Sequence, residues 1–312
     1  MPLDPDLETL LHSQGSLGVP DLDAMPLAQA LATLRAAKPP QAPPANETAL
    51  VEDRLIPGPG WHRIPIRIYR PPERTAIPRG VMLHYHGGGW VGGSIGNDDI
   101  RNHLTSCRAG IVIVSVDYRL APEHRFPAGL DDAYAAFAWV AENAGAIGAD
   151  PARIAVGGAS AGGNLATAVA MLARDRRGPP IRLQLLTYPI CDTSLTQASH
   201  RENADGPLLG SRMMGWFIDQ YLQAGADPAD PLVAPLRALD LRGLPPALIV
   251  TAECDPLRDE AEAYAARLRD AGVTVACTRY DGMVHGFVTR APDLPQSRSA
   301  MAQIVGVLSE YL

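Results

Sequence analysis

The sequence predicts an α/β protein with a mostly parallel central sheet, helices on both faces of the sheet and a helical cap. From residue 80 onward, short apolar runs alternate with amphipathic helical patterns, which is typical of parallel strands that are buried by helices on both faces. A glycine-rich turn in residues 156–163 joins one apolar run directly to a helical pattern. Two segments, residues 1–45 and 191–240, contain helical patterns outside this alternation, and they predict the cap.

Composition and charge narrow the class of protein and its partners. The 312 residues are 46% hydrophobic and 20% charged, as in an ordinary globular chain, and this length permits one large core with added helices. The formal net charge is −7 and there is no long Lys/Arg cluster, which argues against nucleic acid and favours a neutral small molecule as partner. No stretch approaches the roughly 18–20 apolar residues of a membrane span. The acidic start of the chain lacks the basic and apolar regions of a secretory signal, so the sequence predicts a cytoplasmic protein.

The four cysteines are far apart, with no CxxC pair and no metal-ligand spacing. They are most simply free thiols in a reducing compartment, although their spacing leaves a disulfide between two of them open. Because no cluster of metal-ligating residues is visible, the sequence predicts neither a metal nor a cofactor.

The first elements are two short helices and two strands. Helical spacing of leucine and alanine predicts the helices, at residues 4–13 and 25–37. Residues 38–47 hold four prolines within six residues, which remove backbone donors and fix φ, so this segment is predicted to be a linker. Residues 49–56 and 62–70 then alternate like half-buried strands, and Pro65 predicts an edge position for the second.

The remaining elements alternate between strands and helices. Strands are predicted at residues 80–86, 110–118, 153–159, 181–189, 246–253 and 273–280. Helices are predicted at residues 129–144, 160–174, 259–272 and 299–312, with a further helix at 211–222 inside the insertion. The predicted organisation is a cap segment at 1–45, a core at 46–190, a cap insertion at 191–240 and the rest of the core at 241–312.

A serine stands in the glycine-rich turn. The run Gly158-Ala159-Ser160-Ala161-Gly162 is a G-x-S-x-G sequence at the junction of a predicted strand and helix. So sharp a turn requires small neighbours, and it exposes the hydroxyl at the carboxyl end of the sheet, beside a helix N-terminus that favours negative charge. A glycine-rich turn could instead bind phosphate, so a catalytic serine needs partners elsewhere in the chain.

The predicted partners lie after other strands. His86–Gly89, with the sequence HGGG, follows an early strand, and its glycines leave backbone N–H groups uncovered, so it is predicted to bind an oxyanion rather than to be a flexible loop. His285 lies between the last predicted strand and the final helix and is the predicted base. Asp255 comes directly after a buried strand and is the predicted orienting acid. The chain order serine, acid, histidine is that of an α/β-hydrolase.

Other carboxylates and histidines compete for these roles. The rival acids are Glu253, expected within a strand, Asp259, expected at a helix start, and Asp281, expected in a turn. His86 is expected to fix the glycine loop by hydrogen bonding. The other histidines are expected to be structural (His84 and His124), solvated at the surface (His12, His62 and His200) or are left open (His103).

Five stretches, in chain order, resemble the hormone-sensitive lipase family of α/β-hydrolase esterases, also called bacterial family IV. They are HGGGW, VDYRLAPEHRFPAGLDDAY, GASAGGNLA, DPLRDEAEAYAARL and GMVHGF, and the likeness covers nearly the whole chain after about residue 50. The resemblance implies a nucleophile, base and acid at Ser160, His285 and Asp255, and an oxyanion hole from the N–H groups of Gly88, Gly89 and Ala161. It also implies a helical cap over acyl and alcohol pockets. Ala159 departs from the family, whose members commonly have Asp or Thr there, so any hydrogen bond of that side chain is missing.

These observations predict a carboxylesterase that hydrolyses short- to medium-chain acyl esters through a Ser-His-Asp triad and a covalent acyl-enzyme. Amidase, lactonase and acyltransferase activities stay open because they share the acyl-enzyme, and a non-catalytic ligand-binding protein on this scaffold is a further alternative. Large apolar residues predict either a modest hydrophobic cleft or ordinary core packing: Trp90, Met213, Met214, Trp216 and Phe217. The resemblance also permits a homodimer through the last strand and helix, where residues 274–280 would form an exposed sheet edge.

Overall fold

The computed structural model describes residues 2–13, 22–36, 42–73 and 75–312, and one eight-stranded sheet runs through its centre. The strands are β1 (Leu50–Pro57), β2 (Arg63–Arg70), β3 (Arg79–Tyr85), β4 (Val112–Val116), β5 (Ala149–Ala159), β6 (Leu183–Thr187), β7 (Ala247–Cys254) and β8 (Val275–Val284). Their order is β1-β2-β4-β3-β5-β6-β7-β8. The β1/β2 and β2/β4 pairs are antiparallel and all the others are parallel, so the predicted mostly parallel sheet is confirmed.

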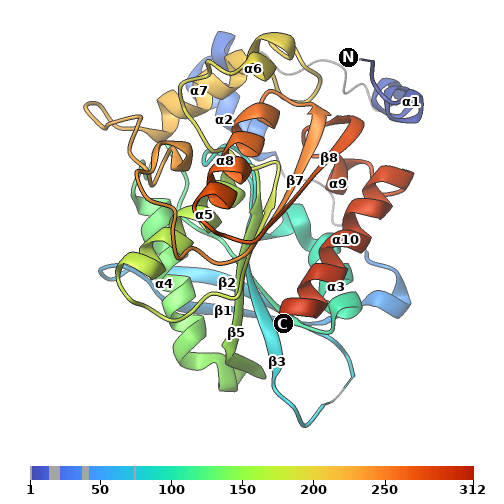
Figure 1. Ribbon diagram of the computed structural model, residues 1–312, viewed down its shortest axis with the longest axis vertical. Coiled ribbons are helices and arrows are strands. Elements are labelled where there is room, and N and C mark those ends of the chain that lie inside the picture. The colour runs from blue at the N-terminus through green and yellow to red at the C-terminus, as the bar shows by residue number, and fades with distance from the viewer. Residues whose placement is uncertain (1, 14–21, 37–41, 74) are drawn as a thin grey trace.

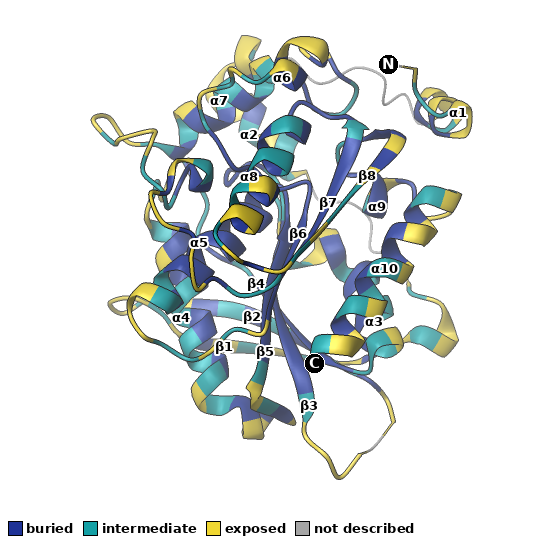
Figure 2. Cartoon of the chain, in the orientation of Figure 1, coloured by how far each residue is buried: buried dark blue, intermediate teal, exposed yellow. Residues whose placement is uncertain are grey.

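Helices cover both faces of this sheet (Figure 1). They are α1 (Pro5–Ser13), α2 (Leu27–Arg35), α3 (Asp99–Ala109), α4 (Ala128–Asn143), α5 (Ala161–Asp175), α6 (Ala198–Glu202), α7 (Ser211–Tyr221), α8 (Arg258–Asp270), α9 (Phe287–Arg290) and α10 (Pro295–Tyr311). Helices α4, α5 and α8 lie on one face, and α3 and α10 lie on the other. The central strands are buried between these layers (Figure 2), and apolar side chains form a separate cluster on each face. Burial on both faces explains why these strands are apolar throughout.

The predicted edge position of the second strand is wrong. β2 pairs with β1 on one side and with β4 on the other, so β1 is the edge strand. The ladder between β2 and β4 begins only at Ile66, and the carbonyl of Pro65 accepts the N–H of Asp117 just beyond it. Proline is tolerated here because it lies at the end of that ladder rather than within it.

The sequence patterns missed helix α3. Its buried positions are largely polar rather than apolar: Arg101, Asn102, His103, Thr105 and Ser106. Nδ1 of His103, for example, accepts the N–H of Ala49 at 3.0 Å, which gives this histidine a structural role. A helix that packs on the sheet through polar residues has no apolar stripe, so hydrophobic periodicity cannot reveal it.

The helices α1, α2, α6 and α7 lie beyond the end of the sheet toward which β7 and β8 run (Figure 1). Arg35, at the end of α2, donates to the carbonyl oxygens of Val91 and Ala121 at 2.8 Å each and forms a bidentate pair with Glu123. Residues 38–41 of the predicted linker lie outside the described residues. No helix in the described ranges is both long enough and apolar enough to span a membrane.

The parallel strands bring distant residues to one edge of the sheet. Ser160 follows β5, Tyr188 follows β6, Asp255 follows β7 and His285 follows β8, and these four strands are successive neighbours. Because parallel strands end on the same side, these residues lie along one edge, which is where α/β sheets bind ligands.

Candidate active site

Ser160 occupies a sharp turn between β5 and α5. Its backbone has φ 57° and ψ −120°, and a positive φ is rare for a residue with a side chain, so the turn stores strain. A Cβ atom added at Gly162 would lie 1.9 Å from the carbonyl oxygen of Tyr85, and one added at Gly158 would lie 2.5 Å from the same oxygen. The end of β3 therefore passes so close to the turn that only glycine fits two residues before and two residues after Ser160.

Asp255 and His285 are in direct contact. Oδ2 of Asp255 lies 2.8 Å from Nδ1 of His285, and Oδ1 accepts the N–H of Leu257 at 2.9 Å. The Asp255 side chain is fully buried, whereas the imidazole keeps 14% of its surface exposed. With Nδ1 bonded to the carboxylate, Nε2 is the ring nitrogen left to exchange a proton with a substrate or a hydroxyl.

The rival acids make other contacts. Glu253, within β7, accepts the N–H of Gly282 at 2.7 Å, and Asp259 accepts the N–H of Ser199 at 2.8 Å. Asp281 lies inside β8, so the prediction of a turn there is wrong. The strand continues because the register between β7 and β8 shifts after Ala252 and pairing resumes near the strand end.

The predicted oxyanion loop lies against the Ser160 turn. A Cβ added at Gly87 would be 3.6 Å from Cβ of Ser160. Gly88 and Gly89 have φ values of 118° and 61°, which favour glycine, and their N–H groups donate to no protein acceptor among the described residues. Ala161 is the first residue of α5, where an N–H has no acceptor within the helix. Three amides in and beside the turn are thus available to a ligand.

His86 fixes this loop, as expected. Its Nδ1 lies 2.8 Å from the carbonyl oxygen of Gly87, and its ring stacks on Tyr118 with centroids 4.3 Å apart. The hydroxyl of Tyr118 donates to the carbonyl of His86 at 2.7 Å. Burial lowers the pKa of His86, so the ring is neutral and acts by packing and hydrogen bonding.

Sequence reasoning missed Tyr188, which follows β6. Its φ is 40°, and its ring centroid lies 4.8 Å from that of His285, so the phenol ring packs beside the imidazole. Burial raises the pKa of Tyr188 to about 12, which keeps the phenol neutral. Two residues later, the N–H of Ile190 donates to the carbonyl of Ser160 at 3.3 Å. The only signal was an aromatic residue directly after a buried strand, which by itself indicates packing.

The Ser160 hydroxyl and His285 are not hydrogen-bonded to each other anywhere in the described structure. Both contact the segment that begins at Tyr188, Ser160 through its carbonyl and His285 through its ring. In enzymes without bound substrate this contact is often long and tightens only in the complex.

Among the other histidines, the expectation for His200 is wrong. This residue is only 2% exposed and its Nε2 lies 2.9 Å from Oε2 of Glu260, so it is a buried residue rather than a solvated one. His84 is structural, as expected, with Nε2 2.9 Å from Oδ2 of Asp98. His12 is exposed, as expected, and His124, which was expected to be structural, is exposed as well. Within the described residues, no group of three or more His, Cys, Asp or Glu side chains has a metal-binding arrangement.

Comparison with known proteins decides the family. A family model described as alpha/beta hydrolase fold matches residues 82–289. The carboxylesterase NlhH of Mycobacterium tuberculosis is 44% identical over an alignment of 269 positions, which covers 84% of this chain and 83% of that protein. The arylesterase of Saccharolobus solfataricus is 35% identical over an alignment of 312 positions, which covers 99% of this chain and 98% of that protein. The chain belongs to the α/β-hydrolase family.

Solved structures match this α/β hydrolase along its whole length. The crystal structure of DphMB1 has a TM-score of 0.89 and 40% identity, covering 100% of this chain and 99% of that one. A hyperthermophilic esterase from the archaeon Pyrobaculum calidifontis has a TM-score of 0.87 and 38% identity, covering 99% of each chain. The predicted fold and the predicted membership of the hormone-sensitive lipase group are therefore confirmed.

Proposed function

We propose that this α/β hydrolase cleaves carboxylic esters with Ser160 as the nucleophile, His285 as the general base and Asp255 as the orienting acid. One observation carries the proposal: Asp255 holds Nδ1 of His285 at 2.8 Å, on the sheet edge where the strained Ser160 turn also lies. The relatives support the reaction class, because NlhH is a carboxylesterase and LipN, also of Mycobacterium tuberculosis, is a carboxylic ester hydrolase.

The reaction has two acyl-transfer steps. Oγ of Ser160 forms a bond to the ester carbonyl carbon as His285 takes the hydroxyl proton, and the carbonyl oxygen becomes an oxyanion. Asp255 stabilises the imidazolium and holds its tautomer. The carbon–oxygen bond to the alcohol then breaks, and the proton on His285 passes to the leaving oxygen. Water, deprotonated in turn by His285, attacks the acyl carbon; the bond to Oγ of Ser160 then breaks, the proton on His285 returns to Oγ, and the acid is released.

The oxyanion is assigned to the amides of Gly88, Gly89 and Ala161. These donors are fixed in position before the reaction, so they stabilise the developing charge without reorganising, and the loss of one such donor typically costs on the order of 10²–10³ in rate. Two observations support this assignment. The glycine loop lies close to the Ser160 turn, and the N–H groups of Gly88 and Gly89 have no protein acceptor among the described residues.

The substrate class that we propose is short- to medium-chain acyl esters. Phe217 of α7 packs on the oxyanion loop, since a Cβ added at Gly89 would lie 2.3 Å from its ring, and this contact limits the space beside the reacting carbonyl. Trp90 and Met214 are each 1% exposed and therefore serve core packing rather than pocket lining. The ethyl acetate hydrolase of Pseudomonas putida, 37% identical over 86% of this chain and 85% of its own, is a relative named for a short ester.

Labelling with a phosphonylating serine reagent tests the nucleophile. We expect one equivalent of label on Ser160, and none on a Ser160→Ala variant that serves as the blank. A chain-length series of p-nitrophenyl esters, from acetate to laurate, should give its highest rates among the shorter chains. Product analysis with competing acceptor alcohols or amines separates hydrolysis from acyl transfer. An unlabelled wild-type protein would rule out the nucleophile and favour a ligand-binding role.

The remaining assignments are also proposals. We propose that residues 1–45 and 191–240 form the cap over the core at 46–190 and 241–312. A homodimer through β8 is supported by its position at the end of the strand order, where half of a strand's backbone hydrogen-bonding groups are open to a partner. A cytoplasmic location is supported by Cys107, Cys191 and Cys277, which form no disulfide, as is usual in a reducing compartment.

A further inference from the structure

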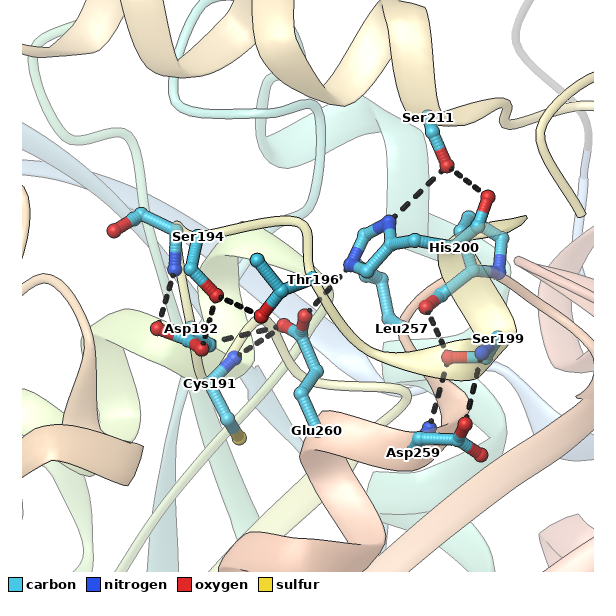
Figure 3. Close-up of polar contacts among 12 residues, drawn as sticks. Cys191, Asp192, Ser194, Thr196, Ser199, His200, Ser211, Leu257, Asp259 and Glu260 are labelled. Atoms are coloured by element: carbon cyan, nitrogen blue, oxygen red, sulfur yellow. Dashed lines mark hydrogen bonds and ion pairs between the residues drawn. The ribbon is translucent and has the colours of Figure 1, made fainter.

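A buried polar network joins the insertion at residues 191–240 to helix α8 (Figure 3). Glu260, in the first turn of α8, accepts the N–H groups of Cys191 and Asp192 on Oε1, at 2.8 and 3.2 Å. Its Oε2 lies 2.9 Å from Nε2 of His200 in α6. The side chains of Glu260 and His200 are 0% and 1% exposed. Each oxygen of this buried carboxylate thus has a protein partner, as burial demands.

The contacts of His200 fix the positions of the protons. Ser211 Oγ lies 2.6 Å from the carbonyl oxygen of His200, and since a carbonyl cannot donate, the hydroxyl hydrogen lies in that contact. Nδ1 of His200, 3.2 Å from the same Oγ, is therefore a donor. One more proton lies between Nε2 and Glu260, so the pair carries no net charge wherever that proton resides. Burial raises the pKa of Glu260, while His200 and the two amides oppose the rise.

The same carboxylate supports the segment that contacts two residues of the proposed triad. The Tyr188 ring packs on His285, and the N–H of Ile190 donates to the carbonyl of Ser160. The next two residues of that segment are the ones whose amides Glu260 holds. Glu260 also stands on α8, which begins at Arg258, three residues after Asp255, and the carbonyl of Asp255 accepts the N–H of Arg258. The buried side chain of Glu260 therefore connects the segment that contacts the nucleophile and the base with the helix that follows the acid.

We propose that Glu260 is a positioning residue for the triad, an inference that rests on the function proposed above. Its Oε1 fixes residues 188–192 against Ser160 and His285, and this link affects the alignment of the reacting groups and hence kcat. Its Oε2, through His200, ties the cap helix α6 to the same point, and this second link affects the cap and hence KM. Glu260 itself touches neither the substrate nor the reacting atoms.

Asp259 offers a matched control on the neighbouring position. Its Oδ2 accepts the N–H of Ser199 at 2.8 Å, and its own N–H donates to Ser199 Oγ at 3.2 Å, so it also attaches α6 to α8 (Figure 3). It makes no hydrogen bond to residues 188–192 in the described structure. A comparison of the two acids therefore separates attachment of the cap from support of the triad.

The test measures kcat, KM, the melting temperature and phosphonate labelling for the wild type and four variants. Glu260→Met has nearly the same shape but no acceptor for the two amides and no partner for His200. We expect kcat to fall ~10- to 100-fold, because displacement of catalytic groups by about an ångström has effects of this size, and KM to rise as it does in His200→Gln. Glu260→Gln keeps an oxygen for both amides and an N–H for neutral His200, so kcat should stay within ~3-fold of the wild type. His200→Gln should mainly raise KM. Asp259→Ala, which has no acceptor for the N–H of Ser199, should lower the melting temperature and leave kcat unchanged.

Two results would overturn the positioning role: a Glu260→Met protein with wild-type kcat, or an Asp259→Ala protein that loses as much kcat as Glu260→Met. If Glu260→Met does not fold, Glu260→Asp replaces it, because it keeps the charge while drawing the oxygens back by one methylene. Its kcat should fall and its KM should rise, because both oxygens are drawn back, and wild-type kcat in this variant refutes the proposal. Labelling of the wild type at Ser160 is measured first. An unlabelled wild type overturns the proposed function, whereas a labelled wild type with unaltered kcat in the Glu260 variants overturns only the inference about Glu260.

Discussion

Substitution of Gly162 by alanine tests the geometry of the Ser160 turn at its tightest point. The added Cβ would lie 1.9 Å from the carbonyl oxygen of Tyr85 and 2.6 Å from that of His86, whereas ordinary contacts begin at 3.4 Å. Both obstacles are backbone atoms, so no side-chain rotation can relieve the overlap. Either the turn or the end of β3 must move by about 1.5 Å relative to the other, and that movement separates Ser160 from the loop that we assign to the oxyanion.

The expected losses follow from that displacement. Overpacking of a tight site typically costs about 1–3 kcal/mol, and we expect the upper end here because only backbone can yield. A misplacement of about 1 Å can cost 10²-fold in rate, so kcat/KM for a short p-nitrophenyl ester should fall by at least ~100-fold.

Gly306→Ala is the matched control. Gly306 lies in α10 with nothing within 4 Å of an added Cβ, so alanine there should stabilise the fold by roughly 0.5–1 kcal/mol and leave kcat/KM unchanged. Thermal unfolding and steady-state kinetics measure both variants. A Gly162→Ala protein with wild-type kcat/KM and melting temperature would refute the close approach of β3 to the turn, and with it the argument for glycine at this position.

Three further predictions concern other parts of the molecule. Asp255→Asn should lower kcat by ~10³- to 10⁴-fold with a smaller change in KM, because an amide no longer holds the required tautomer of His285; a loss below tenfold in steady-state kinetics would contradict the assignment of the acid. The hydrogen bond from Arg35 lowers the pKa of Glu123 to about 2 from 4.5, so ionised Glu123 adds stability above pH 4.5 that disappears as the pH falls toward 2. In urea unfolding, the difference in the free energy of unfolding between the wild type and Glu123→Gln should become smaller as the pH falls from 4.5 to 2. A difference that stays constant would show that Arg35 and Glu123 do not pair. Burial raises the pKa of Cys277 to about 11, so a disulfide reagent at neutral pH should label it slowly in the folded protein and rapidly after denaturation, and rapid labelling of the folded protein would contradict its burial.

Much of the site was predictable because its requirements are local. The Ser160 turn needs glycine at fixed offsets, and both glycines are in the sequence at those offsets. Asp255 and His285 could be selected because each directly follows a strand of a parallel sheet, and the structure places them 2.8 Å apart. The residues that determine the chemistry of a strand end are thus consecutive in the sequence. A parallel sheet, which the fold class implies, then places these strand ends at one edge.

Buried polar residues were not predictable, because their burial depends on partners that are distant in the chain. Helix α3 has no apolar stripe, and its polar face is stable only because groups such as the N–H of Ala49 meet it in the folded protein. His200 looks like a surface residue of an insertion until Glu260, 60 residues later, is placed against it. Burial of a polar side chain costs free energy unless its hydrogen-bond partners are in position. Each such contact therefore fixes the relative placement of two elements more sharply than an apolar contact does. The polar links missed from the sequence are therefore the ones able to align separate catalytic loops, and the pair of Glu260 and His200 is such a link, between residues 191–192, α6 and α8.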